Sequence, residues 1–314
     1  MKKSLNQLLN IEHPIICAPM FLVSNVAMVK AAMQAGIAGC IPALNYRTLP
    51  ELKDAINQLK AAKTTNGAFG FNLIVNKSNL KFPDQLAVCC ELGVDFIITS
   101  LGNPKQVIDE AHKKEILVFC DVVNLEQAKK VENLGCDAII AVNNEAGGHR
   151  GSLPPKKLIE TLNEAVQIPV ISAGGVGNKT ELDEKISYGA VGVSIGSPFI
   201  ASEEAGVSNE YKEACVRYGE KDIVVTQKIS GTPCTVINTP YVQEIGTEQS
   251  GLEKFLNTNK WLKKYIKMLR YLKGTNRVTK AAAGATYKTV WVAGPTIEHT
   301  KAIEPMAKII ERFI

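Results

Sequence analysis

Long apolar runs are missing from this sequence of 314 residues, and aromatic residues are few, at 6%. No uninterrupted apolar stretch approaches the roughly 20 residues that a bilayer-spanning helix requires. The first residues, Met1–Gln7, include two lysines and no apolar signal-peptide core. We therefore expect a cytoplasmic protein without membrane contact.

Paired cysteine motifs are also absent. None of the eight cysteines belongs to a Cys-x-x-Cys pair, and most lie inside apolar runs such as Ile15–Cys17 and Val118–Cys120. A chain of this length does not need a disulfide framework, and its four histidines do not have the spacing of zinc ligands. We expect reduced, buried thiols and no bound metal.

Positive charge is concentrated in one segment rather than spread along the chain. The formal net charge is +5, and residues 253–280 contain nine Lys and Arg against one acid, Glu253. This segment alone carries +8, so the other residues together carry −3. Because the basic charge is local, it does not indicate a general nucleic-acid role, and we expect no nucleic-acid partner.

Short apolar, β-branched runs alternate with helical stretches of about 10–15 residues. The runs cover residues 14–18, 36–41, 68–73, 94–99, 116–120, 137–142, 169–172 and 190–195. They are apolar throughout, as parallel strands covered on both faces are. Glycine joins a helix to the next strand in 92–94 and again in 134–136. The pattern predicts an α/β fold, a (β/α)8 TIM barrel, with a doubly wound open sheet as the alternative.

The alternation stops after residue 200. Residues 207–220 are predicted to form a helix, and residues 221–246 to form extended and turn structure. Residues 252–273 have the periodicity of one amphipathic helix. A final helix is predicted over residues 297–313, where the chain returns to the barrel.

This pattern divides the chain into two parts. Residues 1–200 and 290–314 are predicted to form the barrel. Residues 201–289 are predicted to form an inserted C-terminal lid segment that binds substrate.

Two glycine turns follow the last two predicted strands. The segment Ser172–Asn178 contains Gly174 and Gly175 and is followed directly by a predicted helix, and Gly196–Ser197 follows the next strand. In TIM barrels these two loops often bind phosphate, because backbone amides and a helix N-terminus attract anions. Each turn alone is more often only a tight turn. Together they predict a phosphate-bearing ligand.

The loop after the sixth predicted strand contains a histidine flanked by glycines, in Glu145–Gly151. Glycine costs helix stability and provides no packing, so His149 does not fit the core face of a helix. Imidazole transfers protons near neutral pH, and this loop belongs to the catalytic end of a barrel. We expect His149 to be the catalytic residue, the alternative being an incidental histidine on a surface loop. Glu145 and Arg150 either orient the imidazole or form a structural ion pair. The remaining histidines are expected at structural or solvated positions: His13, His112 and His299.

Several of these segments can be compared with known families: Ile16–Met20, Phe71–Leu73, Glu145–Gly151, Ser172–Val176 and Ile195–Phe199. Together they resemble the nitronate monooxygenase family, formerly called 2-nitropropane dioxygenase. The resemblance covers nearly all of residues 10–200 and returns weakly near residues 290–296. The related flavin-type enoyl-acyl-carrier-protein reductase shares most of these motifs.

The resemblance implies a noncovalently bound FMN and names the residues around it. His149 would be the acid/base group, and Asn72 would lie next to the isoalloxazine. The FMN-binding residues implied by the motifs are Ala18, Pro19, Met20, Asn72, Gly147, Gly148, Ala173, Gly174, Gly175, Ser194, Gly196 and Ser197.

Three positions depart from the family pattern. Val142 stands where the family usually has Gln or Glu, Pro295 where Gln is usual, and Phe21–Val23 where glycine is frequent. These changes leave FMN binding in place, and they affect side chains expected to line the substrate pocket.

The resemblance implies a monooxygenase that oxidises alkyl nitronates or nitroalkanes with O2 to carbonyl compounds and nitrite. An alternative is an NAD(P)H-dependent enoyl-acyl-carrier-protein reductase, because the basic segment 253–280 could attract an acidic carrier protein. A third possibility is a barrel that binds a sugar or nucleotide phosphate without flavin. All three hypotheses predict a small-molecule substrate or ligand. A homo-oligomer stays open, since barrel enzymes often self-associate.

Overall fold

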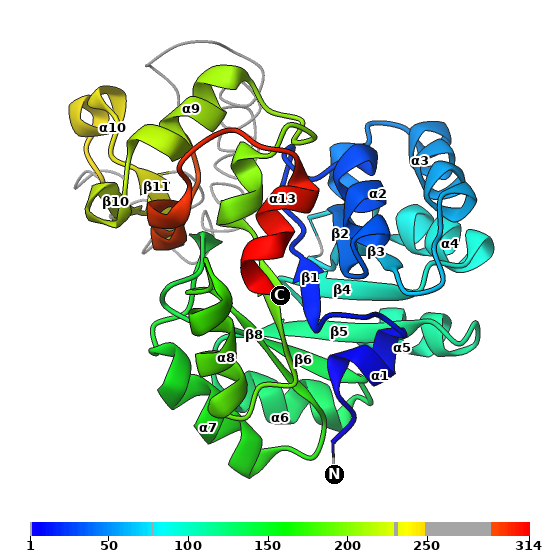
Figure 1. The fold of residues 1–314 in the computed structure, drawn as a ribbon. Helices are drawn as coiled ribbons and strands as arrows, with labels where there is room; N and C mark the ends of the chain where they lie inside the picture. Colours follow the sequence, from blue (N-terminus) through cyan, green and yellow to red (C-terminus); the bar gives the residue numbers. More distant parts are fainter. Residues whose placement is uncertain (1, 77, 229–231, 249–289) are drawn as a thin grey trace.

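Eight parallel strands close into a barrel in the computed structural model, which describes residues 2–76, 78–228, 232–248 and 290–314 (Figure 1). Around the barrel the strands are β1 (Ile15–Cys17), β2 (Ala38–Pro42), β3 (Ala68–Ile74), β4 (Phe96–Ser100), β5 (Leu117–Val122), β6 (Ala138–Val142), β8 (Val170–Ala173) and β9 (Gly192–Ile195). Each strand overlaps one of the predicted apolar runs. The predicted TIM barrel is confirmed.

Side chains fill both faces of the barrel sheet. Ile16, Phe96 and Phe119 belong to one buried cluster inside the barrel, where the rings of Phe96 and Phe119 stack with centroids 5.4 Å apart. Alternate residues such as Ile97 and Ile139 point outward into a second buried cluster that includes helix residues. Because both faces are covered, the strands have no side that faces bulk solvent, which explains their mostly apolar sequences.

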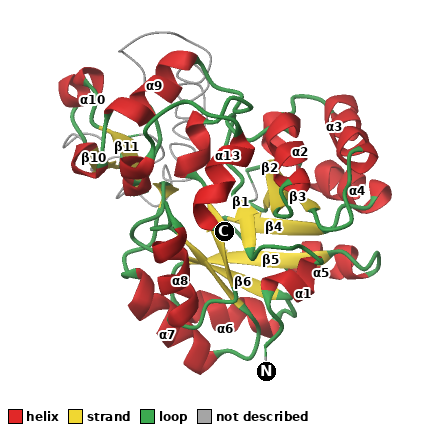
Figure 2. Cartoon of the chain, viewed as in Figure 1, coloured by secondary structure: helices red, strands yellow, loops and turns green. Residues whose placement is uncertain are grey.

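Helices surround the barrel (Figure 2). They are α1 (Leu5–Leu9), α2 (Val26–Gln34), α3 (Leu49–Ala61), α4 (Phe82–Leu92), α5 (Lys105–His112), α6 (Leu125–Asn133), α7 (Pro155–Ala165) and α8 (Lys179–Ser187). Asparagine side chains cap the N-termini of α2, α6 and α8. The predicted glycine joins have positive φ angles, +72° at Gly93 and +90° at Gly135. Glycine takes this conformation without a Cβ clash, so each helix can stop and a strand can begin.

A small second sheet lies over the carboxyl end of the barrel. It has the order β10 (Ile223–Thr226), β11 (Cys234–Ile237) and β7 (Gly148–His149), and both pairings are antiparallel. β7 belongs to the loop after β6, so the segment after the barrel strands pairs directly with that loop. The sequence indicated extended structure near residues 221–246 but not this pairing.

Two further helices frame the second sheet. α9 (Asn209–Arg217) lies within the predicted helix 207–220. α10 (Pro240–Ile245) corrects the expectation of only extended and turn structure over 221–246. Thr239 accepts a hydrogen bond from the Val242 amide, and Pro240 occupies the first helical position, both of which favour a helix start.

The predicted final helix over residues 297–313 is wrong. The chain forms a 3₁₀ helix at Pro295–His299, then α13 (Met306–Ile310) and a last 3₁₀ turn at Glu311–Phe313. Pro305 explains the break, because a proline disfavours helical backbone in the residue before it and lacks the amide proton a helix interior needs. The last turn still packs on the barrel: the rings of Phe313 and Phe199 lie 6.0 Å apart.

Several expectations fall on other parts of the chain. The helix predicted over 252–273 and the basic segment 253–280 lie outside the described residues. The division into barrel and lid segment stays a prediction. All eight cysteines are described, none is in a disulfide, and seven are buried. Among the helices described, none is long and apolar enough to cross a bilayer.

Candidate functional site

A cavity of about 850 Å³ opens at the carboxyl ends of the barrel strands. Active sites of TIM barrels form at this end, and the volume is typical of sites for cofactors and small molecules. Its walls come from the strand ends, the loop that contains β7, and Cys234 and Val292 of the segments that cover the barrel. The described part of the chain contains no cluster of side chains suited to a metal ion.

All residues that the sequence assigned to the site line this cavity. They are Ala18, Pro19, Met20, Asn72, Gly147, Gly148, His149, Ala173, Gly174, Gly175, Ser194, Gly196 and Ser197. They come from the ends of β1, β3, β6, β8 and β9, which are far apart in the sequence. The barrel brings them together around one cavity. Their individual roles stay predictions.

The two glycine turns are neighbours because β8 and β9 pair, with Ala173 opposite Ser194. Gly174 has a φ angle of +107°, and a Cβ there would lie 2.5 Å from the backbone nitrogen of Ala146. Gly175 has a φ angle of +72°. A side chain at either position would strain the turn after β8, and both glycines line the cavity.

The turn after β8 is tied to the loop after β6 by one buried side chain. Asn143 is fully buried; its Nδ2 donates to the Gly174 carbonyl at 3.0 Å, and its Oδ1 accepts from the Glu145 amide at 2.8 Å. The sequence prediction did not single out Asn143. Its position directly after an apolar strand was the available signal, and only the fold shows what it holds.

The second sheet fixes the glycine loop that precedes His149. The Gly148 amide donates to Thr235 Oγ1 at 2.8 Å, and that hydroxyl donates to the Ala146 carbonyl at 3.2 Å. Cys234 is the strand partner of His149. Thr235 is therefore a supporting residue that sequence reasoning missed, since nothing local links it to a loop 87 residues earlier.

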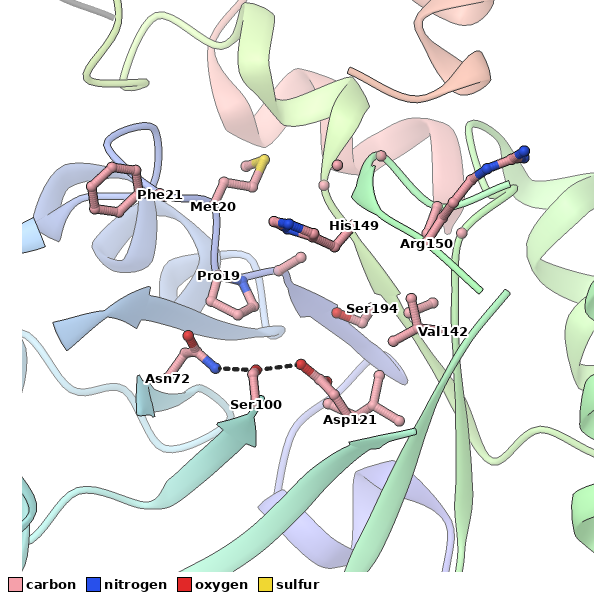
Figure 3. Close-up of a pocket in the computed structure, with 18 of the residues that line it drawn as sticks. Pro19, Met20, Phe21, Asn72, Ser100, Asp121, Val142, His149, Arg150 and Ser194 are labelled. Atoms are coloured by element: carbon pink, nitrogen blue, oxygen red, sulfur yellow. Dashed lines mark hydrogen bonds between the residues drawn. The ribbon is translucent and has the colours of Figure 1, made fainter. Parts of the chain in front are cut away.

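His149 lies on the cavity wall at the end of β7, with its ring turned toward the space between Met20 and Ser194 (Figure 3). The side chain is accessible from the cavity, but the protein that surrounds the ring displaces much of its hydration. This burial lowers the pKa of His149 below its ordinary value. The imidazole is therefore neutral at pH 7 and able to accept a proton.

The two charged neighbours of His149 in sequence have other partners. Glu145 lies 3.8 Å from the Nζ of the buried Lys185, and burial is the main reason that the pKa of Glu145 is raised. Arg150 donates to the Asn144 carbonyl at 2.5 Å. Both side chains thus stabilise the loop, and neither of these contacts is with the imidazole.

The other histidines do not line the cavity. His112 ends α5 and contacts Asp137 at 2.9 Å. His299 ends a 3₁₀ helix and contacts Glu181 Oε1 at 3.0 Å, which links the C-terminal segment to α8.

A chain of polar side chains on the floor of the cavity was not predicted. Asn72 Nδ2 donates to Ser100 Oγ at 2.8 Å, and the Ser100 hydroxyl donates to Asp121 Oδ2 at 2.5 Å (Figure 3). The three residues come from the adjacent strands β3, β4 and β5. Burial raises the pKa of Asp121 to about 6, against the opposing effect of the Ser100 hydroxyl. An acid at the end of an apolar strand was the missed signal.

The positions that depart from the family pattern have different surroundings. Val142 and Phe21 line the cavity. Pro295 begins a 3₁₀ helix and is not among the lining residues. Beside it, the Gly294 amide donates to Ser197 Oγ at 2.8 Å, which fixes the returning C-terminal segment against the turn after β9.

A closed parallel barrel, with a large cavity at the carboxyl ends of its strands and an imidazole on the cavity wall, defines a (β/α)8-barrel enzyme. The family model described as nitronate monooxygenase matches residues 2–314. The chain belongs to the nitronate monooxygenase family, and the resemblance seen in its motifs is confirmed.

The known proteins that are similar to this chain differ in name. The (3aS,4S,5R,7aS)-5-hydroxy-7a-methyl-1-oxo-octahydro-1H-indene-4-carboxyl-CoA dehydrogenase of Rhodococcus jostii is 29% identical over 251 residues, 80% of this chain and 69% of the relative. A probable nitronate monooxygenase of Staphylococcus saprophyticus is 28% identical over 283 residues, 76% of this chain and 79% of the relative. The structure of FabK from Thermotoga maritima covers 100% of this chain and 95% of FabK, with a TM-score of 0.83 and 28% identity.

These findings agree on the general chemistry. The protein is a flavin-dependent oxidoreductase of the nitronate monooxygenase family, and its substrate is a small molecule.

Proposed function

We propose that the protein is an FMN-dependent monooxygenase that oxidises alkyl nitronates or nitroalkanes with O2 to carbonyl compounds and nitrite. The observation that carries the proposal is the position of His149 on the wall of the same cavity as the two glycine turns. Membership of the nitronate monooxygenase family supports the reaction.

The residues present fit a flavin mononucleotide. Gly174 and Gly175 hold a turn that a Cβ would crowd, and Gly196 and Ser197 follow the neighbouring strand. The N-terminus of α8 begins a few residues later, at Lys179. Backbone amides of residues that line the cavity, together with a helix N-terminus, favour an anion, so these residues would hold the phosphate.

The remaining cavity wall suits a flat, mostly apolar ring system. Pro19 lies between Met20 and Asn72 in the close-up, and Val142 lines the wall near Asp121 (Figure 3). The Ser24 hydroxyl accepts from the Met20 amide and donates to the Ala18 carbonyl, both at 2.9 Å. This pair of hydrogen bonds fixes the backbone after β1, where the ring would rest.

The role of His149 follows from its protonation state. A neutral nitroalkane must lose its α-proton before it is oxidised, and a neutral imidazole on the cavity wall is suited to accept that proton. A nitronate has already lost it. FMN, when bound, supplies the electron transfer, and the protein provides orientation, exclusion of water and proton transfer.

Two measurements test the proposal. The purified protein is expected to be yellow, with the absorption bands of an oxidised flavin, and to release FMN on denaturation. With an alkyl nitronate in air it is expected to consume O2 and release nitrite. A colourless preparation that takes up no FMN contradicts the cofactor, and a yellow preparation that releases no nitrite contradicts the reaction.

A second candidate is an NAD(P)H-dependent reductase of enoyl thioesters on acyl carrier protein. The similarity to FabK over the whole chain and the relative named as a carboxyl-CoA dehydrogenase support it. Anaerobic addition of NADPH separates the two. Rapid bleaching of the flavin absorbance favours the reductase, and slow or absent bleaching favours the monooxygenase.

A further inference from the structure

The polar chain on the cavity floor has a fixed hydrogen-bond direction. Asn72 Nδ2 has two acceptors, the Ile98 carbonyl at 3.2 Å and Ser100 Oγ at 2.8 Å. A carbonyl oxygen only accepts, so the atom of Asn72 that faces Ile98 must be the amide nitrogen. Both protons of the amide are then in use.

Asp121 determines the direction at Ser100. An ionised carboxylate only accepts, so the single Ser100 proton is donated to Asp121 Oδ2. The Ser100 oxygen is left to accept from Asn72. Burial raises the pKa of Asp121 to about 6, so the carboxyl is ionised at pH 7.5 and this direction holds.

The consequence is an acceptor that faces the cavity. With its nitrogen turned to Ile98 and Ser100, Asn72 presents Oδ1 toward the side where Pro19 and His149 lie (Figure 3). Asn72 is 6% exposed, and among the described residues no donor to this oxygen is recorded. A ligand that rests here is favoured when it presents a hydrogen-bond donor, an N–H or an O–H group, to this oxygen.

The barrel places this acceptor opposite the glycine turns. In the closed order of eight strands, β3 and β4 stand four places from β8 and β9 and so lie across the barrel from them. A ligand whose phosphate is held at Gly174 and Ser197 extends across the cavity toward Asn72. An oxidised isoalloxazine has one N–H, at N3 of its pyrimidine ring.

We propose that Asp121, acting through the Ser100 hydroxyl, is a positioning residue that holds Asn72 Oδ1 as the acceptor for the N3–H of the flavin. This inference rests on the proposed FMN binding and adds two residues, Ser100 and Asp121, that lie outside the motifs of the family resemblance. Asp121 acts on the orientation of Asn72 rather than on the reacting atoms.

The test compares FMN with 3-methyl-FMN, which lacks the N3 proton. Flavin-free protein is titrated with each flavin at pH 7.5, and the dissociation constants are read from flavin fluorescence. The variants are Ser100→Ala and Asp121→Asn. Ser202→Ala is the matched control, because Ser202 is buried, its hydroxyl has no hydrogen-bond partner in the described part of the chain, and it does not line the cavity.

Wild type and Ser202→Ala are expected to prefer FMN over 3-methyl-FMN by the same factor. Ser100→Ala and Asp121→Asn are expected to reduce that preference about three- to tenfold, the value of one oriented hydrogen bond. An unchanged preference in both variants overturns the inference while leaving FMN binding intact. If wild type binds no FMN, the proposed function fails and this inference fails with it.

A measurement on wild type alone covers the case in which a variant does not fold. In the complex with nitrogen-15-labelled FMN, the N3 proton is expected to give a resonance that exchanges slowly with water. Fast exchange of that proton, at the rate of free FMN, overturns the proposed contact.

Discussion

His149 and Asp121 show how one cavity shifts the pKa values of a base and an acid in opposite directions. Burial lowers the pKa of His149 and raises that of Asp121 to about 6. In both cases the neutral form is favoured, because charge is poorly solvated there. The imidazole is consequently neutral at pH 7 and able to act as a base, whereas at the carboxyl the hydrogen bond from Ser100 opposes the effect of burial.

Replacing the imidazole should separate two kinds of substrate. We expect His149→Asn to lower turnover of neutral nitroalkanes by roughly 10²–10⁴-fold, the usual contribution of a positioned general base. Turnover of preformed nitronates should change far less, since no proton has to be removed. The readout is nitrite release from each substrate at saturating O2. Equal losses on both would contradict the assigned role.

The pH profile of the wild-type enzyme tests the same residue. Because burial lowers the pKa of His149, nitroalkane turnover should stay high as the pH falls through 6.5, the ordinary value for histidine. It should decline only at lower pH, where the imidazole becomes protonated. A decline centred above pH 6.5 would show that another group controls the step.

Asp121 should make stability depend on pH. Its pKa rises from 3.8 to about 6 on folding, so the folded state binds the proton more tightly. The free energy of unfolding therefore falls as the pH rises from about 4 to about 6, by roughly 2–3 kcal/mol. Asp121→Asn removes this dependence, so the stability of the variant relative to wild type should increase as the pH rises across that range. Urea unfolding of flavin-free wild type and variant at pH 4.5 and 7.5 measures this change in relative stability. A stability difference between the two proteins that is the same at both pH values would contradict the raised pKa of Asp121.

At the scale of elements, the joins between strands and helices fix the site. The turn after β8 needs positive φ angles and a close approach to Ala146, while the loop after β6 needs Asn143 and the hydroxyl of Thr235. Short elements are sufficient because each join is tied to a neighbouring strand. These contacts fix the position of the cavity wall on the barrel strands.

Gly174→Ala should damage this wall. The φ angle of +107° and the contact of 2.5 Å between a Cβ and the Ala146 nitrogen both oppose a side chain. We expect a loss of about 1–3 kcal/mol in the free energy of unfolding and a weaker affinity for FMN. Gly93→Ala is the matched control, because Gly93 has a φ angle of +72° but no atom within 4 Å of a Cβ. Urea unfolding and FMN titration of both variants separate crowding from backbone strain; similar FMN affinities in the two would argue against the proposed phosphate turn.

At the scale of the whole molecule, barrel closure and cofactor binding should be linked. The cavity draws on strands around the entire barrel and on the C-terminal segment, where the Tyr211 hydroxyl donates to the Val292 carbonyl and the Tyr211 ring stacks on Trp291 with centroids 5.9 Å apart. A ligand that binds only the folded state therefore stabilises the chain as a unit.

FMN should stabilise the protein more than riboflavin does. At about 100 times its dissociation constant, FMN is expected to raise the free energy of unfolding by about 2.7 kcal/mol. Riboflavin at the same concentration should give a smaller increase, because it lacks the phosphate that the turns after β8 and β9 would hold. Thermal unfolding with each flavin measures the difference. Equal stabilisation by both would place the phosphate elsewhere.

Much of the fold was predictable because its signals are local. Continuous apolar runs and glycines such as Gly93 and Gly135 depend on a few neighbouring residues, and they predicted the strands and their order. Pro305 was an equally local signal for a helix break, and the prediction of one helix over residues 297–313 did not take it into account. The helix α10 was missed although Thr239 and Pro240 stand at its start.

The candidate site divides in the same way. The amino-acid sequence determined the barrel, the two glycine turns and the histidine between glycines, since each is written in a short stretch of chain. Only the tertiary structure showed that Thr235 holds the loop before His149 and that Asn72, Ser100 and Asp121 form one chain of hydrogen bonds. Such contacts join residues on separate strands, and hydrogen bonds between them form only when the closed barrel has set their distances and removed water from around them.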